Sequence, residues 1–254
     1  MKNYILKIIK SASLNRDVKV FIYLPKDYAD SKEQYPVLYM HDGHNLFDDK
    51  TATYGTSWGI VESFKNIDNL PKVIIVGVET TGPSRMKDLS PYEFTYKDKT
   101  VGGGTDKYYD FMINILKPMI DLEYRTLSDP FNTAVMGSSL GGISSLYAAL
   151  KYSTTFTRFG CISNAFMVSY EAFKHAIYEA DLSSVNKMYL DVGTKEAVER
   201  GQSESYLESN KGIYIALKGK LTKEKLRFDI IPEANHNESA WAKRFPEILK
   251  YIFS

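Results

Sequence analysis

Two adjacent serines lie between glycines in "GSSLGG", residues 137–142. The pattern G-x-S-x-G fits only one register, with Ser139 at its centre between Gly137 and Gly141, and with Ser138 at the variable position. A serine hydroxyl becomes a nucleophile when a sharp turn exposes it and a base removes its proton. Ser139 is therefore the candidate nucleophile, and we expect Ser138 to pack or to make a local hydrogen bond.

The motif occurs by chance often enough to be weak evidence alone, but its context strengthens it. The apolar segment "TAVMG" leads into the motif, and a helical pattern over residues 140–151 follows. A nucleophile elbow needs this order of strand, turn and helix. Glycines are expected on both sides of the serine, because side chains there would collide with the neighbouring strand or helix. The helix N-terminus would point free amides at the reacting centre.

The base that activates the serine should be a histidine, and the chain has four: His41, His44, His175 and His236. Along a chain of this type the order is serine, acid, histidine, so the first two come too early. His175 falls in the helical pattern "YEAFKHAIYEA", where a solvated or structural histidine is expected. His236 follows the last strand pattern in the polar turn "ANHNES" and is the predicted base.

The acid that orients the histidine should follow the preceding strand, where "YLDVGTKEAVE" offers Asp191, Glu196 and Glu199. Asp191 lies inside an apolar strand pattern, where a structural role is expected, and Glu199 is expected to begin the next helix. Glu196 lies in the loop three residues past Gly193, from which a carboxylate can reach a histidine. We favour Glu196 and keep Asp191 as the alternative.

Two backbone amides should hold the oxyanion that forms during acyl transfer. Leu140, directly after the nucleophile, is predicted to supply one of them. The other is expected from the turn in "YMHDGHNLFDD", which follows an early strand pattern. Our choice is Gly43, with Asp42 or His44 as the alternatives one residue away.

Five side chains are candidates for contact with a substrate: His44, Asn45, Trp58, Arg85 and Trp241. For the two tryptophans, packing of a helix against the sheet is an equally good expectation. Arg85 is expected either to pair with Asp88 or to bind a carboxylate or sugar oxygen. It lies in the irregular stretch 80–105, which is too long for an idle loop and is predicted to form part of a binding site.

Hydrophobic patterning predicts the elements that would position these residues. Residues 4–10 and 18–25 alternate as half-buried antiparallel strands do. Short apolar runs, typical of strands covered on both faces, follow at residues 36–41, 72–79, 132–137, 158–163, 187–193 and 226–233. Helical patterns lie between or after them at residues 106–122, 140–151, 203–219 and 238–253, and Pro118 predicts a kink or break in the first. The alternation predicts one α/β domain over residues 1–254, with helices on both faces of a mostly parallel sheet.

Composition narrows the classes of function. The 32 basic and 31 acidic residues form no long block of one sign, which argues against a nucleic-acid or anionic-membrane surface. The single cysteine, Cys161, lies in an apolar run and predicts a buried thiol, and an intramolecular disulfide is excluded. The N-terminus lacks a secretory signal pattern and no apolar run could span a bilayer, so we expect a cytoplasmic protein. The sequence predicts no particular oligomeric state.

Together these segments resemble the putative-esterase family of α/β-hydrolases, which includes enterochelin-esterase-like proteins, esterase D, feruloyl and acetyl-xylan esterases, and mycolyltransferases. The segments that carry the resemblance are "MHDGHNLFD", "GGGTDKYYDFMINILKPMID", "MGSSLGGISSLYAALKY", "DVGTKE" and "NHNESAWAKRFPEIL". The resemblance implies an α/β-hydrolase fold, a triad of Ser139, Glu196 and His236, and no metal or organic cofactor. The chain differs at Asn164, where the family often has proline.

The expected function is that of a serine carboxylic-ester hydrolase that acts through an acyl-enzyme on small or carbohydrate-linked acyl or phenolic esters. An acyltransferase with the same triad is one alternative. A siderophore esterase is another, less expected because no segment resembles the additional N-terminal domain of full enterochelin esterases. A binding module without turnover is disfavoured, because serine, acid and histidine are all present in workable order.

Overall fold

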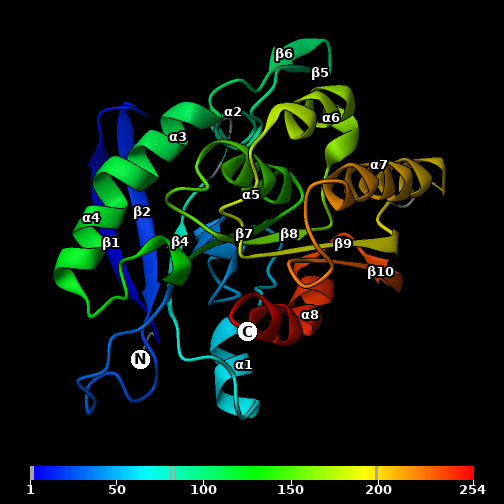
Figure 1. Ribbon diagram of the computed structural model, residues 1–254. Helices are drawn as coiled ribbons and strands as arrows, with labels where there is room; N and C mark the ends of the chain where they lie inside the picture. Colours follow the sequence, from blue (N-terminus) through cyan, green and yellow to red (C-terminus); the bar gives the residue numbers. More distant parts are fainter. Residues whose placement is uncertain (1–2, 81, 83, 198–199) are drawn as a thin grey trace.

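The computed structural model describes residues 3–80, 82, 84–197 and 200–254 and is built on one eight-stranded sheet (Figure 1). In spatial order the strands are β1 (Ile5–Ser11), β2 (Arg16–Tyr23), β4 (Ile74–Val78), β3 (Val37–His41), β7 (Thr133–Ser138), β8 (Arg158–Ile162), β9 (Lys187–Lys195) and β10 (Leu226–Asn235). β1, β2 and β4 pair antiparallel, whereas every pairing from β4 to β10 is parallel. The predicted mostly parallel sheet with antiparallel N-terminal strands is confirmed.

Helices cover both faces of the sheet, as the buried strand patterns predict. They are α1 (Ile60–Asn66), α2 (Ser84–Leu89), α3 (Thr105–Phe111), α4 (Lys117–Glu123), α5 (Leu140–Lys151), α6 (Tyr170–Glu179), α7 (Arg200–Lys218) and α8 (Glu238–Ile252). Apolar side chains of α2 to α7 pack into one core cluster, and those of α1 and α8 into another on the opposite face (Figure 1). Every residue of β3, β4, β7 and β8 is buried between these two layers.

The helical pattern around Pro118 is interrupted as predicted. A π-helical segment, Met112–Leu116, joins α3 to α4, and Pro118 lies in the first turn of α4. A proline ring in a continuous α-helix would clash with the carbonyl of the residue four positions earlier, here Asn114. The wider π turn avoids this contact, so the interruption falls just before the proline.

The irregular stretch 80–105 contains a short helix and a small hairpin, which lie in different parts of the molecule. Its first residues lie beyond the end of β4 and lead into α2. Its middle forms a small hairpin of β5 (Phe94–Tyr96) and β6 (Lys99–Val101), which stands away from the main sheet (Figure 1). Only the beginning of the stretch reaches the cavity described below, so the prediction of a binding role applies to that part.

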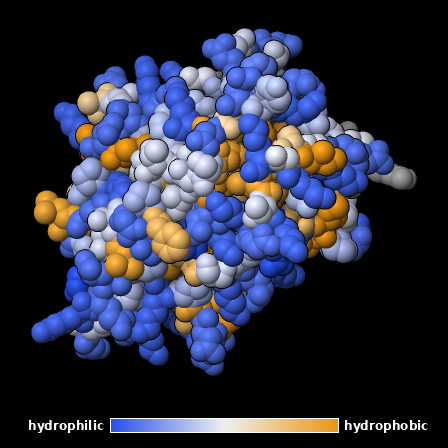
Figure 2. Space-filling view, viewed as in Figure 1, coloured by the Kyte–Doolittle hydropathy of each residue, from blue (hydrophilic) through white to orange (hydrophobic). Residues whose placement is uncertain are grey.

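Hydrophilic side chains cover most of the surface in Figure 2, with apolar side chains gathered in small patches between them. His175 is exposed on α6, as the sequence predicts, and Cys161 is fully buried in β8. Burial raises the pKa of the Cys161 thiol, so this side chain is a structural one. None of the helices in the described ranges is both long and apolar enough to cross a membrane.

Candidate active site

Ser139 lies on a strained turn between β7 and α5. Its backbone has φ 60° and ψ −120°, outside the regions that non-glycine residues ordinarily adopt. The amide of Ser139 donates to the carbonyl oxygen of Ile162 at the end of β8, at 2.9 Å, which fixes the turn against the neighbouring strand. Strain of this kind persists where the surrounding structure determines it, and it concentrates at functional sites. The turn has the strand–turn–helix geometry that the motif predicts.

The close packing around this turn explains its glycines. A Cβ on Gly137 would lie 2.7 Å from Cδ2 of His41 and 2.8 Å from the carbonyl carbon of Gly141. A Cβ on Gly141 would come no closer than 3.3 Å to His41, which is tight but not a collision. At Gly142 the nearest atom, Oδ1 of Asn164, would be only 2.2 Å away. The expected steric requirement therefore holds at Gly137, but on the helix side it falls on Gly142 rather than Gly141.

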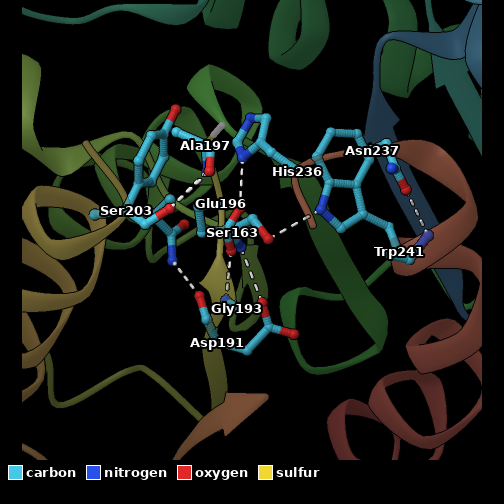
Figure 3. Close-up of polar contacts among 12 residues, drawn as sticks. Ser163, Asp191, Gly193, Glu196, Ala197, Ser203, His236, Asn237 and Trp241 are labelled. Atoms are coloured by element: carbon cyan, nitrogen blue, oxygen red, sulfur yellow. Dashed lines mark hydrogen bonds and ion pairs between the residues drawn. The ribbon is translucent and has the colours of Figure 1, made fainter. Parts of the chain in front are cut away.

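His236 and Glu196 are brought together by the last two strands. His236 Nδ1 lies 2.7 Å from Glu196 Oε2 (Figure 3). Glu196 directly follows Lys195, the last residue of β9, and His236 directly follows Asn235, the last residue of β10. Lys195 and Asn235 are partners in the register of the two parallel strands. Glu196 and His236 therefore each follow one member of the pair Lys195–Asn235, and this pairing places them side by side.

This alignment depends on an irregularity in β10. Ile231 pairs with Gly193, yet the next paired residue of β10, Asn235, faces Lys195. Between these two pairs β10 contains more residues than β9, which is the definition of a β-bulge. Glu233, within this segment, has a positive φ of 59°. Without these additional residues in β10, His236 would no longer follow a residue that pairs with Lys195, and its side chain would be displaced along the strand from Glu196.

Two groups bind the Glu196 carboxylate, the amide of Gly193 and the ring of His236, and Ser163 also contributes to its pKa. Burial by itself would raise the pKa of Glu196, but the bonds from His236 and the other donors outweigh burial and hold this pKa below its ordinary value. The carboxylate is therefore ionised. It is also fixed in place, because one of its oxygens accepts a hydrogen bond from the amide of Gly193, three residues earlier in the chain.

Ser163, which the sequence did not single out, lies directly after β8 and beside Glu196. It has a positive φ of 46° at the end of β8. Its hydroxyl oxygen accepts hydrogen bonds from Trp241 Nε1 and Arg244 Nη2, each at 2.9 Å (Figure 3 draws the first). A hydroxyl has two lone pairs and one proton. With both lone pairs engaged, the hydroxyl proton of Ser163 is the group that can act on Glu196, and Ser163 contributes to the lowered pKa of that carboxyl group.

Asp191, the alternative acid, has different partners. Its Oδ1 accepts the amide of Ser163 at 2.9 Å, and its Oδ2 lies 2.8 Å from Nε of Arg244. The carboxyl group is fully buried, and burial raises its pKa to about 6 although Arg244 opposes this effect. Asp191 thus has the structural position expected within a strand. The other carboxylate considered, Glu199, lies outside the described residues.

A cavity of about 370 Å³ opens over the elbow and contains Ser139 and His236 in its lining. The five side chains predicted to contact substrate all line this cavity: His44, Asn45, Trp58, Arg85 and Trp241. Thr80 and Gly82, from the start of the irregular stretch, line it too. The structure therefore gathers the predicted residues at one site, and their contact with a substrate stays a prediction.

Arg85 has another partner than the sequence suggested. Its Nε and Nη2 bind the two oxygens of Asp42, each at 2.8 Å. Asp88 pairs instead with Arg16 of β2, so the expected Arg85–Asp88 pair is wrong. The reason is that Asp42 lies on the turn after β3, directly facing the cavity side of α2, while Asp88 is buried against β2. The bidentate pair fixes a guanidinium at the cavity wall.

Glu238 and Thr53, which the sequence did not single out, also line the cavity and bind two of the predicted residues. Glu238, at the start of α8, accepts a hydrogen bond from Asn45 Nδ2 at 3.1 Å, and burial raises the pKa of its carboxyl group. His44 Nε2 lies 2.9 Å from the hydroxyl of Thr53. The other ring nitrogen of His44 is buried and has no hydrogen-bond partner within the described ranges. The cavity thus offers several polar groups close to the nucleophile.

The two tryptophans have the packing role expected of them, and their contact with a substrate stays a prediction. Trp58 and Trp241 are almost fully buried in the core cluster of α1 and α8, with ring centroids 5.7 Å apart. Both also line the cavity. Since the indole N–H of Trp241 binds Ser163, this side chain connects the wall of the cavity to the acid.

The turn after β3 supplies a candidate second amide for the oxyanion. It is a single 3-10 turn, Gly43–Asn45, whose first N–H groups have no partner within the turn. Gly43 packs against β4, where an added Cβ would lie 2.4 Å from the carbonyl carbon of Gly77. His44 and Asp42 line the cavity, whereas Gly43 is absent from its described lining. Leu140 is absent from that lining as well, so the choice among the amides of Asp42, Gly43 and His44 stays a prediction, and we use His44 in the proposal below.

His41, at the end of β3, is a neutral residue that lines the same cavity and packs beside the elbow. Its Nδ1 lies 2.9 Å from the hydroxyl of Tyr108, and burial lowers its pKa to about 4. It therefore supports the turn by packing against Gly137 rather than by carrying charge. Within the described residues, no group of three or more His, Cys, Asp or Glu side chains is arranged to hold a metal ion.

Comparison with known proteins assigns the chain to a family. The Bacillus subtilis protein YbbA is 25% identical over 238 residues, which are 91% of each chain. An IroE-like serine hydrolase from Shewanella oneidensis has a similar fold, with a TM-score of 0.78 and 23% identity, over 98% of this chain and 80% of the other. The siderophore hydrolase EstA from Aspergillus nidulans has a TM-score of 0.75 and 18% identity, over 98% of this chain and 95% of the other. The family model described as "Putative esterase" matches residues 11–252, and the chain therefore belongs to the putative esterase family.

Proposed function

We propose that this protein is a serine esterase that hydrolyses carboxylic esters with Ser139, His236 and Glu196. The observation that carries the proposal is the 2.7 Å contact between His236 Nδ1 and Glu196 at the cavity that also contains Ser139. Because Glu196 engages Nδ1, the other ring nitrogen is the one available to the serine. Membership of the putative esterase family supports the same reaction.

In the first step, Ser139 Oγ attacks the ester carbonyl carbon and His236 Nε2 accepts its proton. Glu196 holds the ring in the required tautomer and stabilises the imidazolium that forms. The amides of Leu140 and His44 receive the negative charge on the carbonyl oxygen. The carbon–oxygen bond to the alcohol then breaks, and His236 returns the proton to the departing oxygen, which leaves an acyl group on Ser139.

In the second step, water attacks the acyl carbon while His236 accepts one of its protons. The bond between the acyl carbon and Ser139 Oγ then breaks, and His236 gives the proton to that oxygen. The products are the free acid and the regenerated serine, so one ester and one water are consumed.

The cavity wall supports polar esters as substrates. Arg85 presents a guanidinium that is fixed by Asp42, and Asn45 and Glu238 present further polar groups beside it. Polar groups held in place in this way bind hydroxyl or carboxylate oxygens at low entropic cost. We therefore propose small acyl esters of sugars or phenols as the substrate class, in which the polar part of the ester occupies this wall.

Siderophore esters are a second candidate class, and one comparison favours them. EstA is a siderophore hydrolase, and this chain covers 95% of it, so that enzyme has little beyond the common fold. The similarity in fold over almost the whole of EstA therefore supports siderophore esters as the second candidate class.

Turnover of p-nitrophenyl acetate by Ser139→Ala and His236→Ala tests the triad. We expect kcat/KM to fall by at least about 1000-fold in each variant, since nucleophile and base act as a unit. His175→Ala, which changes an exposed histidine on α6, is the matched control and should keep wild-type activity. Near-wild-type turnover by either site variant would reject the proposal. A panel of acetyl, butyryl, feruloyl and siderophore esters then decides the substrate class by kcat/KM.

A further inference from the structure

The first turn of α8 directly follows His236. Asn237 is the N-cap of this helix, and its Oδ1 accepts a hydrogen bond from the amide of Ala240 at 2.9 Å. Glu238 is the first residue of the helix, two positions after His236. The ring of His236 lies edge-on to that of Trp241 in the same turn, with ring centroids 5.1 Å apart (Figure 3). The position of His236 therefore depends on where the first turn of α8 is held.

Glu238 connects this turn to a loop that is distant in the sequence. Its Oε1 accepts a hydrogen bond from Asn45 Nδ2 at 3.1 Å, although the two residues are 193 positions apart. Both side chains are buried, and both line the cavity that contains Ser139. Loss of one partner would leave the other polar group without its hydrogen bond in a site with little access to water, which costs more than loss of an exposed bond.

Asn45 also fixes the loop after β3. Its Oδ1 accepts the amide of Thr53 at 2.9 Å, and its carbonyl oxygen accepts the amide of Trp58 at 2.8 Å. Its own amide donates to the carbonyl oxygen of Asp42 at 2.8 Å and closes the turn that holds the candidate second oxyanion amides. The side chain of Asn45 thus binds its own loop through the oxygen and α8 through the nitrogen.

We propose that Glu238 is a positioning residue whose hydrogen bond to Asn45 sets the distance between the oxyanion turn and the base. The inference rests on the proposed function. Ester hydrolysis requires His236 to transfer a proton while backbone amides receive the charge on the carbonyl oxygen, so both must be aligned at once. The oxyanion turn follows β3 and His236 follows β10, and β7, β8 and β9 lie between these strands in the sheet. The bond from Glu238 to Asn45 joins the two loops directly across this separation.

This role requires an acceptor at position 238 and does not require a charge. A carboxylate, a neutral carboxyl group and an amide oxygen can each accept the N–H of Asn45. Burial raises the pKa of the Glu238 carboxyl group, so a neutral side chain suits the site. Glutamine at this position therefore keeps the bond and removes the charge, whereas alanine removes both.

Hydrolysis of p-nitrophenyl acetate by Glu238→Ala and Glu238→Gln tests the inference. This ester has no hydroxyl or carboxylate group for the polar wall, so it reports alignment of the reacting groups. We expect Glu238→Ala to lower kcat about tenfold with KM changed less than about twofold, and Glu238→Gln to keep kcat within about threefold of wild type. Glu247→Ala, which changes an exposed glutamate of the same helix, is the matched control and should have wild-type kinetics.

A reversed pair of side chains gives the sharper test. Asn45→Asp keeps the oxygen that binds Thr53, removes the donor and places two carboxyl groups against each other. Glu238→Gln in the same protein supplies a donor from the opposite side, which the new carboxylate can accept. We expect Asn45→Asp alone to lower kcat about tenfold and the double variant to recover most of this loss, as coupled residues do in a double-mutant cycle.

Wild-type kcat in Glu238→Ala would overturn the inference, and a change confined to KM would do the same by assigning Glu238 to substrate contact. An equal loss of kcat in Glu238→Gln would show that the charge matters rather than the bond. A double variant no more active than Asn45→Asp would also contradict the coupling. Failure of the proposed function is distinct, because the unmodified protein would then turn over no ester of the panel and Ser139 would not react with a fluorophosphonate probe.

Discussion

Asp191 and Glu196 are two buried carboxylates, one in the middle of β9 and one directly beyond its end, and their pKa values shift in opposite directions. Glu196 lies one residue beyond the strand, and its partners hold its pKa below the ordinary value. Asp191 lies within the strand, and burial raises its pKa to about 6. One carboxylate contacts His236, and the other contacts Arg244. Distance along the chain from the strand end separates the two roles.

The physical reason is the freedom of the backbone. Inside β9 the side chain of Asp191 must project from a sheet covered on both faces, so it can only be satisfied by partners brought to it. Beyond the strand the chain can turn, and the Glu196 carboxylate bends back to the amide of Gly193 while still reaching His236. A carboxylate that orients a catalytic base needs this second position.

The strongest way to break the comparison is to neutralise each carboxylate separately. We expect Glu196→Gln to lower kcat/KM for p-nitrophenyl acetate by about 1000-fold, since the histidine then loses its orienting charge. Asp191→Asn should lower it by less than about threefold, because the asparagine oxygen can still accept from Ser163 and Arg244. A larger loss in the Asp191 variant would reverse our assignment of the triad acid.

Ser163 connects the two carboxylates, because its amide donates to Asp191 and its side chain helps to lower the pKa of Glu196. Ser163→Ala removes the hydroxyl alone and should lower kcat about tenfold with KM unchanged, as the acid loses one donor and Trp241 loses its acceptor. Ser11→Ala, at a buried serine of β1 far from the site, is the control and should have no effect on turnover. A raised KM with an unchanged kcat would show that Ser163 affects substrate binding and does not act through Glu196.

The sequence allows the sheet, its antiparallel N-terminal strands and the elbow to be predicted, because apolar periodicity and glycine spacing are local signals. The order of Ser139, Glu196 and His236 along the chain also indicates the candidate triad. Pro118 marks the helix interruption for the same reason, since the clash of its ring involves only nearby backbone. Local chemistry is sufficient for each of these features.

Other features depend on contacts between distant segments and leave no local signal. The bulge in β10 that aligns Asn235 with Lys195 can be recognised only when the two strands are paired. Arg85 had a plausible partner three residues away in Asp88, but the turn after β3 brings Asp42 closer to it.

The smallest expected effect, and the most direct test of the contrast between Asp191 and Glu196, is the pH dependence of stability. A lowered pKa in the folded protein gives Glu196 a stabilising contribution that is present above its unfolded pKa of about 4.3 and is lost as the pH falls through the folded value. A raised pKa gives Asp191 the opposite dependence, because its contribution is full below its unfolded pKa of about 3.9 and is lost as the pH rises through about 6. Urea unfolding between about pH 3.5 and 7 should therefore show the wild-type advantage over Glu196→Gln growing with pH and that over Asp191→Asn shrinking. If the difference in unfolding free energy from wild type had the same pH dependence for both variants, the pKa values of Asp191 and Glu196 would not shift in opposite directions.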